Sequence, residues 1–124
     1  MPDNTQSNTG RKYAPNTVGK QEFVDSMSRM AAEVWDFHNR FEIGSGQFEG
    51  QSATDIVANR TSILDEEFNE LAQAISEKEG DEAVADETAD ILFVAMGHAE
   101  AMGRPGIDGT DRVSNKAAAK TSET

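Results

Sequence analysis

The chain has 124 residues, no cysteine, and a net charge of −12 that arises from 23 acidic and 11 basic residues. This length fits one domain with a modest core, which burial against a second subunit would help to stabilise, so we expect a homodimer or a homotetramer. The charge disfavours polymeric nucleic acid as a partner. The lack of cysteine excludes a disulfide framework, a thiolate zinc site and thiol catalysis.

No apolar run approaches the roughly 18 residues that a membrane span needs, and the N-terminal segment lacks the apolar stretch of a signal peptide. We therefore expect no membrane partner and a cytoplasmic protein. Residues 1–16 are rich in Asn, Thr, Ser and Pro without an apolar period, which predicts a flexible tail. A single helical domain is expected over residues 17–122.

Helical periodicity dominates the rest of the chain. Between about Val18 and Phe41 the apolar residues recur at steps of three and four, which predicts an amphipathic helix. The glycine-rich stretch over 42–50 predicts a loop. Ser52 and Asp55 resemble a capping box that opens a second long helix, running to about Lys78.

The third helix is expected from Glu82 to about Met102, with Asp81 as its cap and with Gly103 and Pro105 ending it. A short fourth helix is predicted at roughly 111–120. Strand-like alternation is lacking, so the predicted fold class is all-α, with three long helices plus a short C-terminal helix.

Two acidic motifs carry the chemistry: Glu66-Glu67-Phe-Asn-Glu70 and, after sixteen intervening residues, Glu87-Thr-Ala-Asp90. Positions three or four apart share a helix face, so each motif projects a pair of carboxylates. Placed antiparallel, the two helices would hold four carboxylates around one small volume. Such a concentration of charge needs cations, and hard oxygen ligands suit Mg²⁺ or Mn²⁺ rather than zinc.

The position of these carboxylates beside apolar residues argues against a merely solvated face. On a helical wheel an apolar stripe adjoins Glu67 and Glu70; its members are Leu64, Phe68, Leu71 and Ile75, extended by Ile63 and Ala74. Burying anions without a compensating cation is costly. The pattern therefore predicts a metal site in which Glu67, Glu70, Glu87 and Asp90 are the ligands.

Three segments resemble a known family. Arg60–Ala74 is similar to an RxxLLxEExxELxxA pattern, Asp86–Gly97 to DExxDxLYVxxG, and Val34–Phe41 to VxxFHxxF. These are patterns of the MazG-like all-α nucleoside triphosphate pyrophosphohydrolases, the last one of the branch related to phosphoribosyl-ATP pyrophosphatase. The resemblance covers roughly residues 30–105 and departs from the family at Phe93, where tyrosine is frequent. It also departs at Ala117, which replaces the asparagine of a KNxxKT ending.

The resemblance implies a four-helix-bundle core completed by oligomerisation, and Mg²⁺-dependent hydrolysis of a nucleoside triphosphate between its α and β phosphates. The products would be the monophosphate and pyrophosphate, and Mn²⁺ would substitute for Mg²⁺. Glu66, beside Glu67, either receives a proton from the attacking water as the catalytic base or holds a further ion.

The substrate is left open among three kinds. A purine deoxynucleotide such as dGTP is preferred, for sanitation or remodelling of the nucleotide pool, and dUTP and phosphoribosyl-ATP are alternatives. A different class of function is a non-catalytic acidic helical protein that binds metal or nucleotide without turnover.

Five residues are candidates for substrate binding. Arg60 either binds a phosphate or pairs with Asp65 or Glu67 within the fold. Lys116 and Lys120 lie one turn apart and either clamp the pyrophosphate end, in this subunit or a neighbouring one, or belong to a solvated tail.

The other two candidates are aromatic. His38 either touches the base or ribose or is a structural polar residue, and Trp35 either stacks on a base or packs. His98 is expected to be structural, because a metal site of this kind needs oxygen ligands.

Overall fold

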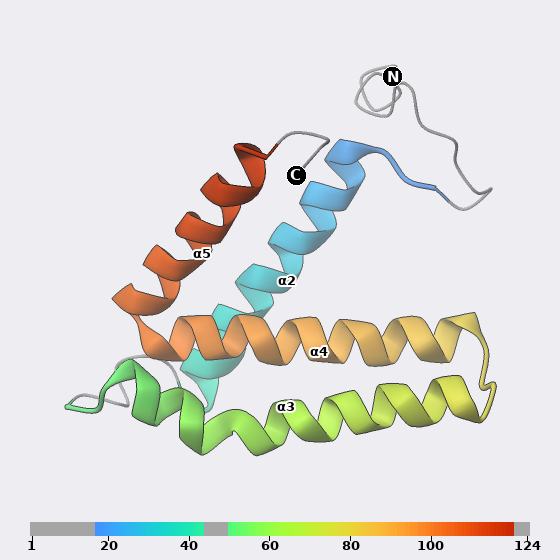
Figure 1. The fold of residues 1–124 in the computed structure, drawn as a ribbon, viewed down its shortest axis with the longest axis horizontal. Helices are drawn as coiled ribbons and strands as arrows, with labels where there is room; N and C mark the ends of the chain where they lie inside the picture. The colour runs from blue at the N-terminus through green and yellow to red at the C-terminus, as the bar shows by residue number, and fades with distance from the viewer. Residues whose placement is uncertain (1–16, 44–49, 121–124) are drawn as a thin grey trace. The chain divides into compact units, whose positions relative to one another are not determined.

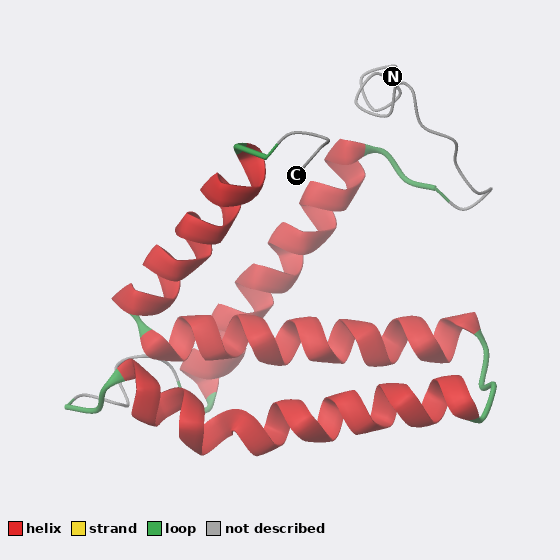
Figure 2. Ribbon diagram, in the orientation of Figure 1, coloured by secondary structure: helices red, strands yellow, loops and turns green. Residues whose placement is uncertain are grey.

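The computed structural model describes residues 17–43 and 50–120, and within these ranges it contains four α-helices and no strand (Figures 1 and 2). The all-α class is thus confirmed for the described residues. The helices are α2 (Lys20–Arg40), α3 (Ala53–Ser76), α4 (Asp81–Met102) and α5 (Arg104–Ala118). Among them, none is both long and apolar enough to cross a membrane.

Contacts divide the chain into two compact units, residues 1–33 and 34–124. Of the first unit the structure describes mainly the first part of α2, whose side chains are largely exposed. The second unit holds the last turns of α2 together with α3, α4 and α5. The predicted tail over 1–16 lies outside the described residues, as do residues 44–49 of the loop predicted over 42–50. The single domain over 17–122 stays a prediction.

The start of α3 agrees with the predicted capping box. Ser52 has extended backbone, and its hydroxyl oxygen accepts a hydrogen bond from the backbone N–H of Asp55 at 3.0 Å. This bond satisfies one of the N–H groups that a helix leaves unpaired in its first turn. The helix ends at Ser76, and the turn into α4 contains two residues with positive φ, Lys78 and Gly80.

Two predictions about helix ends were wrong. Asp81 is the first residue of α4 rather than its cap; Gly80 occupies the cap position, and no side chain caps that end. The last helix begins at Arg104, seven residues before the predicted start. Pro105 lies in its first turn, where proline's missing N–H would have no helical partner and its fixed φ suits the helix.

The antiparallel pair α3 and α4 makes most of the contacts between helices in the second unit (Figure 1). Small and branched residues line its seam, with Ile56 and Ala74 buried on α3 and Gly97 and Ala101 buried on α4. Seven residues back from Glu67 is Arg60, and seven residues forward from Asp90 is Gly97. Glu67 and Asp90 therefore face each other at one level of the seam, and Arg60 and Gly97 face each other at the next level, about two helical turns away.

The apolar stripe predicted on α3 is only partly buried. Leu64 and Leu71 are half-buried, but Phe68 and Ile75 are 50% and 57% exposed. Ala74, predicted at the margin of the stripe, is instead the most buried residue of α3. The methyl group of Ala74 is small enough to be covered completely, whereas the larger side chains of Phe68 and Ile75 extend to solvent.

The joint between α4 and α5 depends on Gly106. A Cβ at this position would lie 2.0 Å from the carbonyl oxygen of Ala99, which is backbone and cannot swing aside. We expect Gly106→Ala to destabilise the fold by about 1–3 kcal/mol through overpacking. Gly109→Ala is the matched control, since its Cβ would meet only the end of Arg112 at 3.6 Å.

The control substitution is expected to stabilise α5 by roughly 0.5–1 kcal/mol, because alanine loses less backbone entropy than glycine in a helix. Urea unfolding followed by circular dichroism would measure both changes. Equal effects of the two substitutions would contradict the close approach of α4 and α5.

Candidate metal centre and nucleotide site

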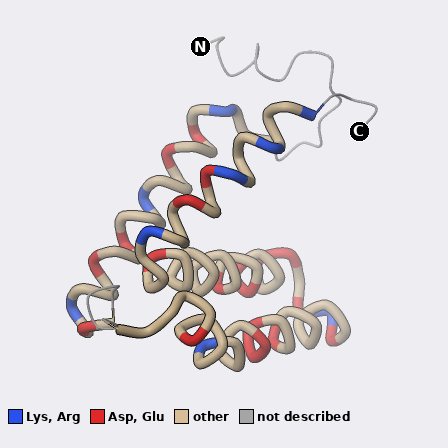
Figure 3. Tube along the Cα trace, turned by 60° about the vertical axis from the view of Figure 1, so that its left-hand side comes forward, with Lys and Arg blue, Asp and Glu red and all other residues tan. Residues whose placement is uncertain are grey.

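Four carboxylates meet on the facing sides of α3 and α4. Glu67, Glu70, Glu87 and Asp90 each offer one oxygen atom, and these four atoms lie within 4.8 Å of one another. Figure 3 shows acidic residues along both helices. The helical spacing pairs the residues within each helix, and the antiparallel register brings the two pairs together. This is the arrangement that the two acidic motifs predict.

The carboxylates are not equally exposed. Glu70 and Asp90 are exposed, whereas Glu67 and Glu87 are half-buried, and the Oε1 atom of each is buried without a hydrogen-bond partner. A buried acceptor without a partner is costly, and a bound cation would satisfy it. The residues present therefore fit a divalent metal ion held by oxygen ligands.

Electrostatics at the cluster point the same way. Burial raises the pKa of Glu67, and the negative charges of Glu70 and Asp90 raise that pKa further. Burial likewise raises the pKa of Glu87, again with contributions from Glu70 and Asp90. Glu67 and Glu87 thus resist ionisation beside the other carboxylates of the cluster. A divalent cation at the centre would reverse the sign of this interaction.

Glu66 is exposed on α3 and is not one of the four grouped carboxylates. It is adjacent to Glu67 in the sequence. Its two predicted roles, catalytic base and ligand of a further ion, both stay proposals.

A second polar group lies two turns along the seam. His38 is 3% exposed, and its Nδ1 lies 2.6 Å from Oε1 of Glu100. Its ring packs against Gly97, where an added Cβ would lie 2.9 Å from His38 Nε2 and 3.6 Å from Nη2 of Arg60. His38 and Arg60, two predicted site residues, are thus neighbours.

Arg60 is half-buried, and its Nε is buried without a hydrogen-bond partner. Burial lowers the pKa of its guanidinium, and the charge of Glu100 opposes that effect. The carboxylate that acts on Arg60 is therefore Glu100 rather than Asp65 or Glu67, which were the partners considered from the sequence. Its place in the seam leaves phosphate binding as a proposal.

His98 is 6% exposed, and burial lowers its pKa, with Arg60 and His38 lowering it further. A lowered pKa keeps this imidazole neutral at neutral pH. Its Nε2 is buried without a hydrogen-bond partner.

The remaining candidates are exposed. Trp35 is 59% exposed on α2, and Phe37, two residues later, makes ring contacts with Phe41 and with Phe93 of α4. Lys116 lies in the last turn of α5, and Lys120 lies two residues beyond the end of that helix. The structure does not group these three candidates with the four carboxylates.

Sequence reasoning missed two residues of the second polar group, Gly97 and Glu100. The signal was available for Gly97, because it follows Asp90 by the same seven residues that separate Arg60 from Glu67. Glu100 gave no such signal, since it belongs to neither acidic motif and is recognised only by its contact with His38.

Two antiparallel helices that bring four carboxylates together define a helical protein suited to divalent metal. More specifically, a family model described as phosphoribosyl-ATP pyrophosphohydrolase matches residues 34–115, more than half of the chain, and the chain belongs to this family. The membership confirms the predicted resemblance and makes the protein a nucleotide pyrophosphohydrolase in general terms. Neither the comparison with curated proteins nor the comparison with solved structures gave a match.

The raised pKa values predict how stability depends on pH without metal. A carboxyl group whose pKa is higher in the folded state favours folding below its ordinary pKa of about 4.5, and this contribution is lost as pH rises through the folded pKa. In EDTA, the free energy of unfolding should therefore fall as the pH rises above about 4.5. Added Mg²⁺ should restore it at pH 7 and raise the melting temperature by several degrees.

Glu87→Gln isolates the contribution of the cluster. We expect this variant to be more stable than the parent at pH 7 in EDTA, to show a shallower pH dependence and to gain less from Mg²⁺. Glu82→Gln, at an exposed site in the first turn of α4, is the matched control. Thermal unfolding of the three proteins with and without Mg²⁺ measures these differences. The same pH dependence in all three would contradict repulsion within the cluster.

Proposed function

We propose that this protein hydrolyses a (deoxy)nucleoside triphosphate between the α and β phosphates, in a Mg²⁺-dependent reaction that gives the monophosphate and pyrophosphate. The observation that carries the proposal is the cluster of four carboxylates with two unpartnered buried oxygens, in a chain that belongs to a pyrophosphohydrolase family. Mn²⁺, which accepts the same oxygen ligands, is expected to substitute for Mg²⁺.

Charge decides how the substrate enters. A triphosphate is an anion and would be repelled by four carboxylates, so it binds as a complex with the cations that Glu67, Glu70, Glu87 and Asp90 hold. When bound, the metal supplies polarisation of the α-phosphoryl group and a lowered pKa for the attacking water. Glu66, exposed beside the cluster, either takes the proton from that water or holds a further ion.

Cationic residues are proposed for the phosphate end. Arg60 lies in the same seam as the carboxylates and carries an unpartnered Nε, so it is the candidate that the geometry supports best. Lys116 and Lys120 are exposed on and after α5, where they would contact pyrophosphate bound to a neighbouring subunit or in their own.

Two aromatic residues are proposed for the base. Trp35 presents an exposed ring on which a base can stack. His38 has its Nδ1 engaged by Glu100, so only its other edge, at Nε2 and Cε1, is left for a contact with the substrate.

A purine deoxynucleotide such as dGTP is the proposed substrate, in sanitation or remodelling of the nucleotide pool. The second candidate is phosphoribosyl-ATP, which the description of the matching family favours. Both substrates present a triphosphate and a purine, so the metal cluster would serve either one.

A homodimer or homotetramer is proposed to complete the four-helix core. Large apolar side chains remain exposed on α2, α3 and α5, among them Phe23, Trp35, Phe68, Ile75, Ile107 and Val113. A chain of this size gains stability by burying such residues against a second copy. A second copy also fits the family expectation of a bundle shared between subunits.

A single product analysis tests the proposed reaction. The purified protein is incubated with each common NTP and dNTP, dUTP, dITP and phosphoribosyl-ATP, in Mg²⁺ or in EDTA, and the products are separated by chromatography. We expect monophosphate and pyrophosphate, without diphosphate, only in Mg²⁺. Glu67→Gln and Asp90→Asn should lower kcat by on the order of 10²- to 10³-fold, because each removes a charge that the metal complex needs.

Glu82→Gln serves again as the control and should keep the activity of the parent. A lack of turnover on the whole panel, with Mg²⁺ still raising the melting temperature, would reject the enzymatic proposal. It would favour a protein that binds metal or nucleotide without turnover.

A further inference from the structure

Side chains from three helices meet over Gly97, two turns along the seam from the carboxylate cluster. They are His38 of α2, Arg60 of α3 and Glu100 of α4, all within the unit formed by residues 34–124. We call them the Gly97 group. Glu100 lies ten residues after Asp90, which is almost three turns of α4, so this group is distinct from the metal ligands.

The contact between His38 and Glu100 defines which imidazole nitrogen carries hydrogen. An ionised carboxylate only accepts hydrogen bonds, so the 2.6 Å contact requires that Nδ1 donates to Glu100. In the neutral ring, Nε2 then keeps its lone pair. Nε2 of His38 and Nη2 of Arg60 both border the small space above Gly97. A Cβ added to Gly97 would lie 2.9 Å from the histidine nitrogen and 3.6 Å from the arginine nitrogen. His38 and Arg60 thus border the same small space, and the charge of Glu100 acts on Arg60.

Arg60 reaches the facing helix, where its Nη2 lies near Gly97 of α4. It leaves α3 on the same face as Glu67, seven residues earlier, which is ~10 Å along the helix axis. Its Nε is a buried donor without a partner, although its charge is balanced by Glu100. Buried donors are nearly always paired, so this one indicates an acceptor that the chain itself does not provide. A guanidinium suits a phosphate oxygen, since its fork of donors matches that geometry.

We propose that His38 and Glu100 are positioning residues, which hold the Arg60 guanidinium toward the terminal phosphates of a triphosphate bound at the metal cluster. Gly97 contributes by having no side chain, because any Cβ there would displace the His38 ring. This inference rests on the proposed function, and it adds residues that the two acidic motifs do not contain. A purely structural role for the group would leave substrate binding independent of Arg60.

A double-mutant cycle separates the two roles. Arg60→Gln, Glu100→Gln and the double variant are compared by steady-state kinetics on the best nucleotide. We expect each single variant to raise KM by about tenfold with kcat within about twofold, and the double variant to be no worse than Arg60→Gln. His38→Asn and Gly97→Ala should raise KM in the same direction, since each disturbs the ring between Glu100 and Arg60.

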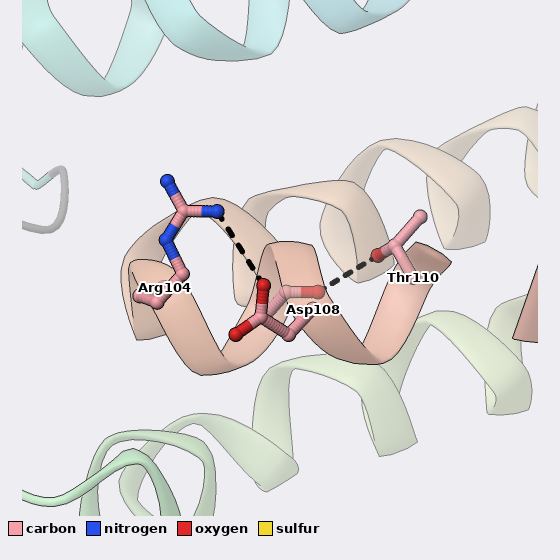
Figure 4. Close-up of polar contacts among 4 residues, drawn as sticks. Arg104, Asp108 and Thr110 are labelled. Atoms are coloured by element: carbon pink, nitrogen blue, oxygen red, sulfur yellow. Dashed lines mark hydrogen bonds and ion pairs between the residues drawn. The ribbon is translucent and has the colours of Figure 1, made fainter. Parts of the chain in front are cut away.

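The controls use the same changes elsewhere. Arg104→Gln removes an exposed arginine that pairs with Asp108 one turn later on α5, at 3.4 Å (Figure 4). Glu82→Gln removes an exposed carboxylate from α4. Both should keep the KM of the parent. Arg60→Lys keeps the charge without the fork of donors and remains informative if a neutral variant at this buried site does not fold.

Binding and spectroscopy make the inference testable apart from turnover. Affinity for inorganic tripolyphosphate in Mg²⁺ should fall about tenfold in Arg60→Gln and Glu100→Gln and not in Arg104→Gln. Long-range ¹H–¹⁵N NMR should show His38 with hydrogen on Nδ1, and Glu100→Gln should alter that pattern. The chain has only two histidines, so the signals are readily assigned.

Failure of the proposed function and failure of the positioning role would give different results. If the parent turns over no nucleotide but binds tripolyphosphate through Arg60, the proposed function fails and the positioning role stands. If KM and tripolyphosphate affinity are unchanged in Arg60→Gln and Arg60→Lys, or if the effects of Arg60→Gln and Glu100→Gln add in full, the positioning role is overturned.

Discussion

Repulsion among four carboxylates is the constraint on which the rest of this structure depends. The antiparallel pair α3 and α4 has to keep these like charges together, within 4.8 Å by one oxygen from each. It does so through a seam of small or branched residues, with Ala74 beyond the cluster at one end and Ile56 and Ala101 at the other. The helices are therefore held by packing, while the charged centre opposes that packing until a cation joins it.

The same register explains why the second polar group lies where it does. Seven residues, or about two helical turns, separate Glu67 from Arg60 on α3 and Asp90 from Gly97 on α4. At the level of Arg60 and Gly97, the charge of Arg60 is balanced by Glu100. The seam thus has the carboxylates at one level and the Arg60 guanidinium at the next. The carboxylates can contact metal ions, and the guanidinium can contact the polyanion that the ions accompany. α4 ends at Met102, and only Gly103 separates it from α5, which has Pro105 in its first turn.

Most of the candidate site could be predicted from sequence because helical spacing alone pairs Glu67 with Glu70 and Glu87 with Asp90. The start of α3 could also be predicted, because serine is a favoured capping residue and the Ser52 hydroxyl accepts a hydrogen bond from the first turn. The contact between His38 and Glu100 could not be predicted, since it joins residues 62 apart in the sequence through tertiary packing. The early start of α5 was missed because proline was taken as a stop, although it is equally favoured in a first turn.

The unpartnered oxygens of Glu67 and Glu87 also bear on the lifetime of the chain. A ligand that binds only the folded state lowers the population of opened molecules by mass action, and proteases act on that population when opening is fast relative to cleavage. The rate of degradation would then follow the concentration of free divalent metal, and of nucleotide bound with it. Supply of the cofactor would thereby govern abundance of the protein as well as its chemistry.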